Sequence, residues 1–300
     1  MTTRSRGPLA GFGWLRDGVS LVFRHPKPLL VGAALLVVAC LLPTLITMPL
    51  QFHSSQIGIQ PSPAFFGWIT GISMLLGLLI VPLYAGYLQM IDTVEHGRPI
   101  RARDIFKPYR EGEAWRLIGF ALAVLLVYVV LFGIVIVTTG RALASWYVQV
   151  LTAQANHQLP PLGLPPGFGI TMALFMVLGL FMMGFYSISL GQVALRRRSV
   201  FGAIGDGLIG AVKNVLPLLV LALTLAIACI VVAIVFGIIA TVIVLLGKLV
   251  GAWFVLVLLI PLYIALGLMM LTVMFGVMYC LWVGVCGDKV AAGMAPSIPA

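Results

Sequence analysis

The stretch "DGVSLVFRHPKPLL" at residues 17–30 returns as "DGLIGAVKNVLPLL" at residues 206–219. Each copy begins with Asp-Gly, continues to a basic residue, and reaches a Pro where a long apolar run starts. The paired residues are Asp17 with Asp206, Gly18 with Gly207, Arg24 with Lys213, and Pro28 with Pro217. A match at such a long separation indicates an architecture assembled from repeated units.

The amino-acid composition indicates that this protein lies in a lipid bilayer. Hydrophobic residues make up 62% of the 300 residues, charged residues only 9%, and the mean hydropathy is +1.16. A soluble globular domain has roughly 25% charged residues, so this much apolar surface needs lipid around it. The apolar runs are continuous and do not alternate with polar residues, as the strands of a membrane barrel would. The sequence therefore predicts an all-α, polytopic transmembrane helical bundle, because helices pair every backbone group within one segment.

Six apolar runs are long enough to cross a bilayer, which requires about 20 helical residues. They cover residues 28–50, 64–92, 115–140, 167–193, 215–246 and 250–286. The last run is long enough to form two spans, but no polar turn divides it, and one long helix is the favoured interpretation. We expect residues 1–300 to form a single transmembrane domain with short cytoplasmic tails.

The charged residues are distributed unevenly between the two sides of these spans. Arg141 and Lys248 lie on one side, and the rest of the 18 basic residues and all eight acidic residues lie on the other. Basic residues in short loops stay in the cytoplasm. The sequence therefore predicts an even number of spans, with both termini in the cytoplasm.

We interpret the chain as three copies of one unit, at about residues 8–95, 99–195 and 199–286. Each unit has a short amphipathic cytoplasmic segment, an outgoing span and a returning span. In the first and third segments, apolar residues recur at spacings of three and four, as on one helical face. They are Leu9, Phe12, Leu15, Val19, Val22 and Phe23 in the first, and Phe201, Ile204, Leu208, Ile209 and Val212 in the third. We expect these helices to lie on lipid or to pack against the bundle.

Two of the returning spans share the tripeptide Pro-Leu-Tyr, at residues 82–84 and 261–263. A proline inside a helix removes one backbone hydrogen bond and bends the helix. One interpretation is a kink that serves packing. The other is that kinks and tyrosines line a central cavity, for which the candidates are Pro82, Tyr84, Pro261 and Tyr263.

Ionisable residues, which acid–base catalysis and proton transport need, are missing from the interior of the predicted spans. Asp, Glu, Lys, Arg and His do not occur well inside them, which disfavours proton-coupled transport and intramembrane catalysis. Gln89 and Gln192 lie near the cytoplasmic ends of returning spans, where they either join helices or contact a lipid headgroup. The histidines lack the spacing of a metal site. We predict no catalytic residue, metal or cofactor and no nucleic-acid partner, and we expect that the protein is not an enzyme.

The span entrances "LRDGVSLVFRHPKPLL" (residues 15–30) and "IGDGLIGAVKNVLPLL" (residues 204–219) carry a resemblance to known families. The chain resembles bacterial six-span membrane families of largely unknown function, such as YciC-like proteins and the membrane domain attached to some glycerophosphodiester phosphodiesterases. The resemblance covers most of the chain and implies a bacterial inner membrane. It supplies no catalytic residues.

The basic clusters beside the spans mainly set the topology, but they can also gather lipid. Each Lys or Arg near an anionic leaflet contributes about 1 kcal/mol of attraction. The candidates for headgroup contact are Arg24, Lys27, Arg101, Arg103, Lys107, Arg110, Arg196, Arg197, Arg198 and Lys213. The sequence thus predicts a non-enzymatic membrane protein that organises, senses or moves lipids, with anionic lipid as its partner. An uncoupled transporter or channel for a small solute is the alternative, and a second copy or another membrane protein is a further candidate partner.

Overall fold

The computed structural model describes residues 3–56, 63–156, 158–159, 161 and 163–287, which form helices and no strand. The long helices are α2 (Pro26–Gln56), α3 (Pro63–Glu95), α5 (Ala114–Thr138), α7 (Phe168–Arg196), α9 (Val215–Val250) and α10 (Ala252–Cys286). The shorter ones are α1 (Ala10–Arg24), the 3-10 helix η1 (Ala102–Phe106), α4 (Lys107–Arg110), α6 (Arg141–Ala155) and α8 (Val200–Lys213). The prediction of an all-α polytopic bundle is confirmed.

All six predicted spans are present as helices that are long and apolar enough to cross a membrane. The last apolar run forms one helix, α10, rather than two. It follows α9 through a turn at Gly251, whose φ of 128° is a conformation that glycine adopts readily. The prediction of six spans is therefore confirmed.

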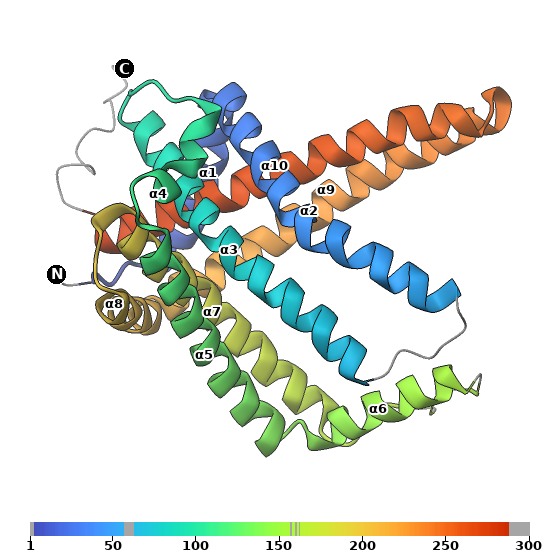
Figure 1. Ribbon diagram of the computed structural model, residues 1–300. Coiled ribbons are helices and arrows are strands. Elements are labelled where there is room, and N and C mark those ends of the chain that lie inside the picture. The colour runs from blue at the N-terminus through green and yellow to red at the C-terminus, as the bar shows by residue number, and fades with distance from the viewer. Residues whose placement is uncertain (1–2, 57–62, 157, 160, 162, 288–300) are drawn as a thin grey trace.

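The long helices form three antiparallel hairpins, α2–α3, α5–α7 and α9–α10, that diverge from a common end (Figure 1). At 1.5 Å per residue, a helix the length of α9 is roughly 54 Å long, against about 30 Å of hydrocarbon. Tilt, or extension beyond the hydrocarbon, must therefore accommodate the excess length. The beginning of α1 and the end of α10 lie at the common end, together with α4 and α8.

The buried core lies at this common end. Leu88 and Ile91 of α3, Phe185 of α7, and Leu281 and Val285 of α10 are inaccessible or nearly so. Toward the opposite ends of the hairpins, large apolar side chains such as those along α9 are exposed. This is the pattern expected of helices whose outer parts contact lipid. We call the buried ends of α3, α7 and α10, with the shorter helices around them, the base.

The leading segment of each predicted unit packs on the hairpin of a different unit. Helix α1 packs on α9 and α10, the η1–α4 segment packs on α3, and α8 packs on α7. Each segment therefore contacts the preceding unit, and the first contacts the third. The contacts in the base are therefore cyclic. Each leading segment joins its own hairpin to the hairpin of another predicted unit, and together the three segments link all three hairpins.

Glycines allow the close approach of these helices. A Cβ added at Gly18 of α1 would lie 2.7 Å from the backbone nitrogen of Val277 in α10. A Cβ at Gly207 of α8, the matching residue in the repeat, would overlap the hydroxyl of Ser189 in α7. Small residues at helix contacts are typical of membrane proteins. This explains why glycines occur in helices despite their low helix propensity.

The face of α1 and α8 that packs on the bundle is largely separate from the predicted apolar stripes, which were expected to lie on lipid or to pack against the bundle. The buried residues are Gly11, Trp14, Gly18, Leu21 and Val22 in α1, and Ala203, Asp206, Gly207, Gly210 and Ala211 in α8. Of the predicted stripes only Val22 is buried, while Phe12, Phe23, Phe201 and Val212 are exposed. Glycines and alanines lie at the closest contacts, beside Trp14 and Leu21 of α1, while large apolar residues such as Phe12 and Phe201 turn outward.

We predict that Gly207→Ala destabilises the protein by about 1–3 kcal/mol, because the new methyl group has no space beside Ser189. Gly205→Ala is the matched control on the same helix, since a Cβ there meets nothing within 4 Å. Its higher helix propensity should leave stability unchanged or raise it by up to about 1 kcal/mol. Thermal unfolding in detergent, followed by circular dichroism, measures both. Equal melting temperatures for the two variants would contradict this account of the contact.

Candidate lipid-facing interface

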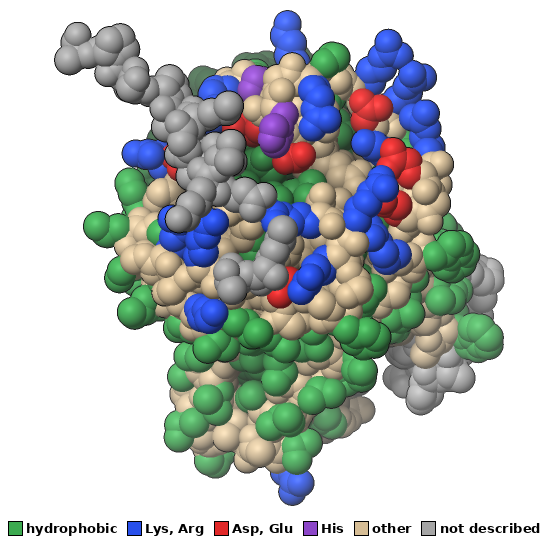
Figure 2. All heavy atoms as spheres, turned by 90° about the vertical axis from the view of Figure 1, so that its left-hand side faces the viewer, with side chains coloured by type: hydrophobic (Ala, Val, Ile, Leu, Met, Phe, Trp, Pro, Cys, Tyr) green, Lys and Arg blue, Asp and Glu red, His purple; other side chains and the backbone are tan. Residues whose placement is uncertain are grey.

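The outer surface of the base is formed by α1, the η1–α4 segment and α8. Figure 2 looks onto this end of the molecule, where Lys and Arg side chains gather with Asp, Glu and His among them. Hydrophobic side chains occupy the edges of the same surface. The surface therefore combines positive charge with exposed apolar groups, as interfacial amphipathic segments do.

Helices α1 and α8 expose large apolar residues at matching positions of the repeat. Phe12 and Phe23 of α1 are 54% and 63% exposed, and their counterparts Phe201 and Val212 of α8 are 85% and 63% exposed. Ser199 starts α8 as its N-cap, with its hydroxyl accepting a hydrogen bond from the backbone of Gly202. In a chain surrounded by lipid, such residues lie where acyl chains can cover them.

The η1–α4 segment presents a mixed basic and aromatic face. In a 3-10 helix, residues three apart lie above one another, which places Arg103 and Phe106 on one side. Ile105 is buried and faces α3, where Gly86 leaves space for its carbonyl oxygen. Pro108 is buried as well, and Tyr109 is exposed beside Phe106.

Tyr109 attaches this segment to the proline-containing part of α3. Its hydroxyl donates a hydrogen bond to the carbonyl oxygen of Leu79. Pro82 lacks an N–H and so frees the neighbouring carbonyl of Leu78 from its helical partner. Burial raises the pKa of Tyr109 further above neutral pH, where a tyrosine hydroxyl is already protonated and able to donate. The α4 helix is thereby held against the middle of α3.

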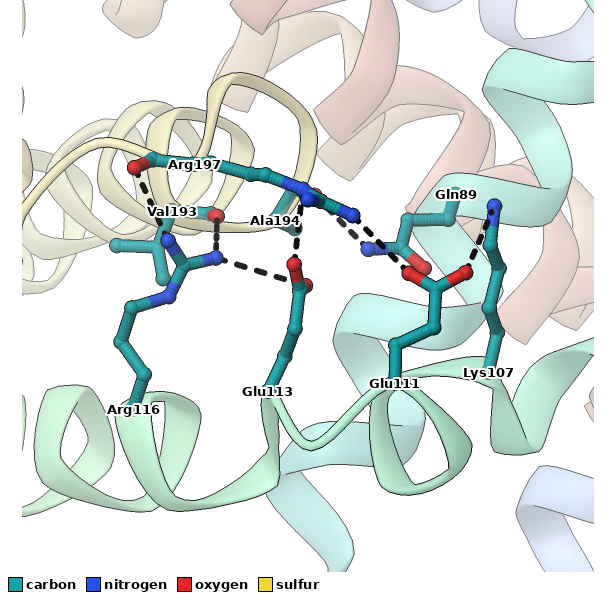
Figure 3. Close-up of polar contacts among 8 residues, drawn as sticks. All are labelled: Gln89, Lys107, Glu111, Glu113, Arg116, Val193, Ala194 and Arg197. Atoms are coloured by element: carbon teal, nitrogen blue, oxygen red, sulfur yellow. Dashed lines mark hydrogen bonds and ion pairs between the residues drawn. The ribbon is translucent and has the colours of Figure 1, made fainter.

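A network of ion pairs joins the end of α7 to the η1–α4 segment (Figure 3). Arg197 contacts Glu113 at 2.8 Å and Glu111 at 3.1 Å, and Lys107 lies 3.7 Å from Glu111. Arg116 lies 3.5 Å from Glu113 and also donates to the carbonyl oxygen of Arg197 at 3.0 Å. The φ of Arg197 is 50°, an uncommon conformation for a residue with a side chain.

Other predicted headgroup candidates are also occupied by internal contacts. Arg198 lies 3.0 Å from Asp206, and Arg24 lies 3.4 Å from Glu95. Arg196 lies over the ring of Trp282, 5.7 Å from its centroid. The ammonium group of Lys213 donates to the carbonyl oxygen of Thr3 at 3.4 Å.

A second set of cations has no such contacts. Within the described part of the chain, no ion pair or hydrogen bond joins their charged groups to another residue. We use the name open cations for five members of this set, Lys27, Arg98, Arg101, Arg103 and Arg110. Most of the open cations belong to the loop and helices between α3 and α5, next to Phe106 and Tyr109. Arg98 was not among the predicted headgroup candidates.

The residues expected to line a central cavity lie in different environments. Pro82 is buried, and the hydroxyl of Tyr84 lies 3.4 Å from the sulfur of Cys40, with Phe275 against its ring. Pro261 is exposed, and Tyr263 is 68% exposed near Phe236 of α9. The structure does not bring the two Pro-Leu-Tyr segments together.

Both glutamines point into the protein rather than toward the surface. Gln89 donates to the carbonyl oxygen of Ala194 at 2.9 Å and so joins α3 to α7. Gln192 is 1% exposed, and its amide donates to Asp206 at 3.2 Å. These contacts match the helix-joining interpretation.

The N-terminal residues complete the cyclic contacts of the base through an interaction without a clear sequence signal. Asn214, at the corner between α8 and α9, is fully buried. Its side-chain oxygen accepts from the backbone of Arg6 at 2.9 Å, and its nitrogen donates to the carbonyl of Arg4 at 2.9 Å. Arg6 also donates from Nε to the carbonyl of Gly284 in α10 at 2.7 Å. The N-terminal segment thus joins α8, α9 and α10.

No group of His, Cys, Asp and Glu in the described ranges is arranged to hold a metal ion. Comparisons with protein-family models, with curated proteins and with solved structures found no match to this chain.

We predict that Glu113→Gln lowers the free energy of unfolding by about 2 kcal/mol, because it weakens charged contacts to both Arg197 and Arg116. Asp17→Asn is the control, since the Arg16–Asp17 pair is largely exposed and should contribute under about 1 kcal/mol. Unfolding in detergent at low and high salt compares them. A loss no larger for Glu113→Gln than for Asp17→Asn would mean that the network contributes little to the fold.

Proposed function

We propose that this protein is a non-enzymatic bacterial inner-membrane protein that gathers anionic phospholipids at its cytoplasmic surface. The observation that supports the proposal most is the orientation of α1 and α8. Their small residues pack on the bundle, and matching large apolar residues, Phe12 with Phe201 and Phe23 with Val212, face outward. An outward apolar stripe beside basic residues is suited to the boundary between headgroups and acyl chains.

The open cations supply the electrostatic part of the proposed interaction. A cation already paired with a carboxylate attracts a phosphate weakly, whereas an unpaired one near the leaflet contributes about 1 kcal/mol. Arg101, Arg103 and Arg110 lie in one short stretch of chain beside exposed aromatic residues. Through these contacts the protein would organise or sense the local content of anionic lipid.

The proposed orientation places both termini in the cytoplasm, and reporter fusions test it. Green fluorescent protein fused after residue 300 should fluoresce, and alkaline phosphatase at the same point should be inactive. The same reporters inserted after Gly251, in the turn between α9 and α10, should give the opposite result. An active phosphatase at the C-terminus would place the base outside the cytoplasm and overturn the proposed orientation.

Lipid preference tests the function itself. The full chain in vesicles should associate more strongly with spin-labelled phosphatidylglycerol than with spin-labelled phosphatidylcholine. Replacing Arg98, Arg101, Arg103 and Arg110 together by Gln should reduce that preference at least about fivefold, since each contact contributes about 1 kcal/mol. Electron spin resonance measures the association of both lipids.

The control for that experiment is Arg141→Gln with Lys248→Gln, which removes charge from the opposite ends of the hairpins. This variant should keep the preference of the parent protein. Equal association of the two lipids with the parent would refute the proposal. Flux of a small solute through the vesicles, independent of phosphatidylglycerol, would instead support the transporter alternative.

A further inference from the structure

An apolar groove runs along the outside of the α2–α3 hairpin, directly below the η1–α4 segment. Its volume is about 490 Å³, within the range of roughly 300–1,000 Å³ that is common for small-molecule sites. Its walls are uncharged side chains of the two long helices, and its upper end is formed by η1 and α4. The residues that define it include Leu35, Ala39, Leu42, Leu79, Phe106 and Tyr109.

The position of the groove limits what can occupy it. The α2 residues along the groove are spaced three and four apart, so they form one stripe parallel to the helix axis. Between Leu35 and Leu42 this stripe extends about 10 Å along the helix. Both walls belong to helices that are long and apolar enough to cross a membrane, and a groove between such helices is suited to hydrocarbon. A flexible acyl chain lying along the helices fits these conditions.

Open cations belong to the same short segment as Phe106 and Tyr109, which form the upper end of the groove. Arg103 is three residues before Phe106, and Arg110 directly follows Tyr109. Both guanidinium groups are exposed and without an ion pair among the described residues, unlike Arg197 and Arg198. Guanidinium groups bind phosphate through paired hydrogen bonds. The groove thus has an apolar body, and the segment at its upper end carries exposed guanidinium groups suited to a phosphate.

Two other apolar grooves in the protein lack this combination. Each has a volume of about 380 Å³ and is lined by residues of the long helices alone. In the α2–α3 groove, by contrast, Phe106 and Tyr109 come from the same short segment as the open cations. The hydrogen bond from Tyr109 to Leu79 fixes this segment over the groove.

We propose that the α2–α3 groove binds one acyl chain of an anionic phospholipid whose phosphate contacts Arg103 and Arg110. The inference rests on the proposed function and makes it specific, since it adds a single site with an apolar and a charged part to a general surface attraction. The site takes a two-part ligand, so neither inorganic phosphate nor a neutral phospholipid satisfies it.

Native mass spectrometry of the full chain in detergent, titrated with phosphatidylglycerol or phosphatidylcholine, tests the proposal. The parent protein should retain one phosphatidylglycerol at concentrations at least tenfold below those needed for phosphatidylcholine. Inorganic phosphate in excess should not displace it. Arg103→Gln with Arg110→Gln should weaken phosphatidylglycerol binding at least tenfold, and Arg141→Gln with Lys248→Gln, which removes the same charge elsewhere, should not.

Variants that fill the groove with a larger side chain distinguish lipid binding in the groove from general attraction of anionic lipid to the basic surface. Ala39→Phe should abolish the tightly bound lipid while the open cations remain. Leu42→Trp, at a position that is half exposed, is a second filling variant in case the first does not fold. Their melting temperatures establish whether each is folded.

The outcomes distinguish the two proposals. If folded groove-filling variants bind one phosphatidylglycerol as tightly as the parent, the groove is not the site, although the interface can still prefer anionic lipid. If the parent shows no single tightly bound lipid but spin-labelled phosphatidylglycerol is still preferred, only the further inference fails. If neither preference exists, the proposed function fails as well. Displacement by inorganic phosphate would show a phosphate site without a lipid chain and would also overturn the inference.

Discussion

Close backbone contact between the leading segments and the returning helices is the constraint on which the base depends. Gly18 of α1 faces Gly276 and Val277 of α10, and Gly207 of α8 faces Ser189 of α7. Lipid is as apolar as a leucine side chain, so helices in a membrane gain little by hiding large apolar residues from it. They gain contact area when small residues let them approach. The points of closest approach on α1 and α8 are consequently glycines, with Trp14 and Leu21 of α1 packed beside them, and residues such as Phe12 and Phe201 are left for lipid.

The same arrangement divides the cations into two kinds. The acidic residues of the base lie near the helix ends and neutralise the arginines that reach across the joints, as Glu111 and Glu113 do for Arg197. Removing such charges from water is acceptable only where opposite charges and hydrogen bonds compensate. The η1–α4 segment carries more basic residues than its carboxylates can pair, so Arg103 and Arg110 are left open. Basic residues therefore have two roles in the base. Arg197 stabilises a helix contact through ion pairs, whereas Arg103 and Arg110 remain exposed and unpaired among the described residues.

The sequence predicted what depends on length and composition, and not what depends on tertiary contacts. Six spans follow from runs of apolar residues longer than the bilayer requires, and the structure contains them. Periodicity located a stripe from Phe12 to Phe23 but could not say whether lipid or protein covers it, because both are apolar. Nothing in the sequence distinguished the paired Arg197 from the open Arg103. A signal for the groove did exist, since Arg103, Phe106 and Tyr109 recur every three residues.

The middle one of the three predicted units differs from the other two in the length of its leading segment, and this difference bears on where the groove lies. Units one and three begin with helices of 15 and 14 residues, which lie across the adjoining hairpins. The second predicted unit begins instead with η1 and α4, of five and four residues, with Pro108 in the first turn of α4. A segment this short contacts α3 through Ile105 and Tyr109 but leaves the α2–α3 surface below it uncovered. The short leading segment of the second predicted unit thus leaves an apolar groove uncovered and carries exposed arginines next to the aromatic residues at its upper end.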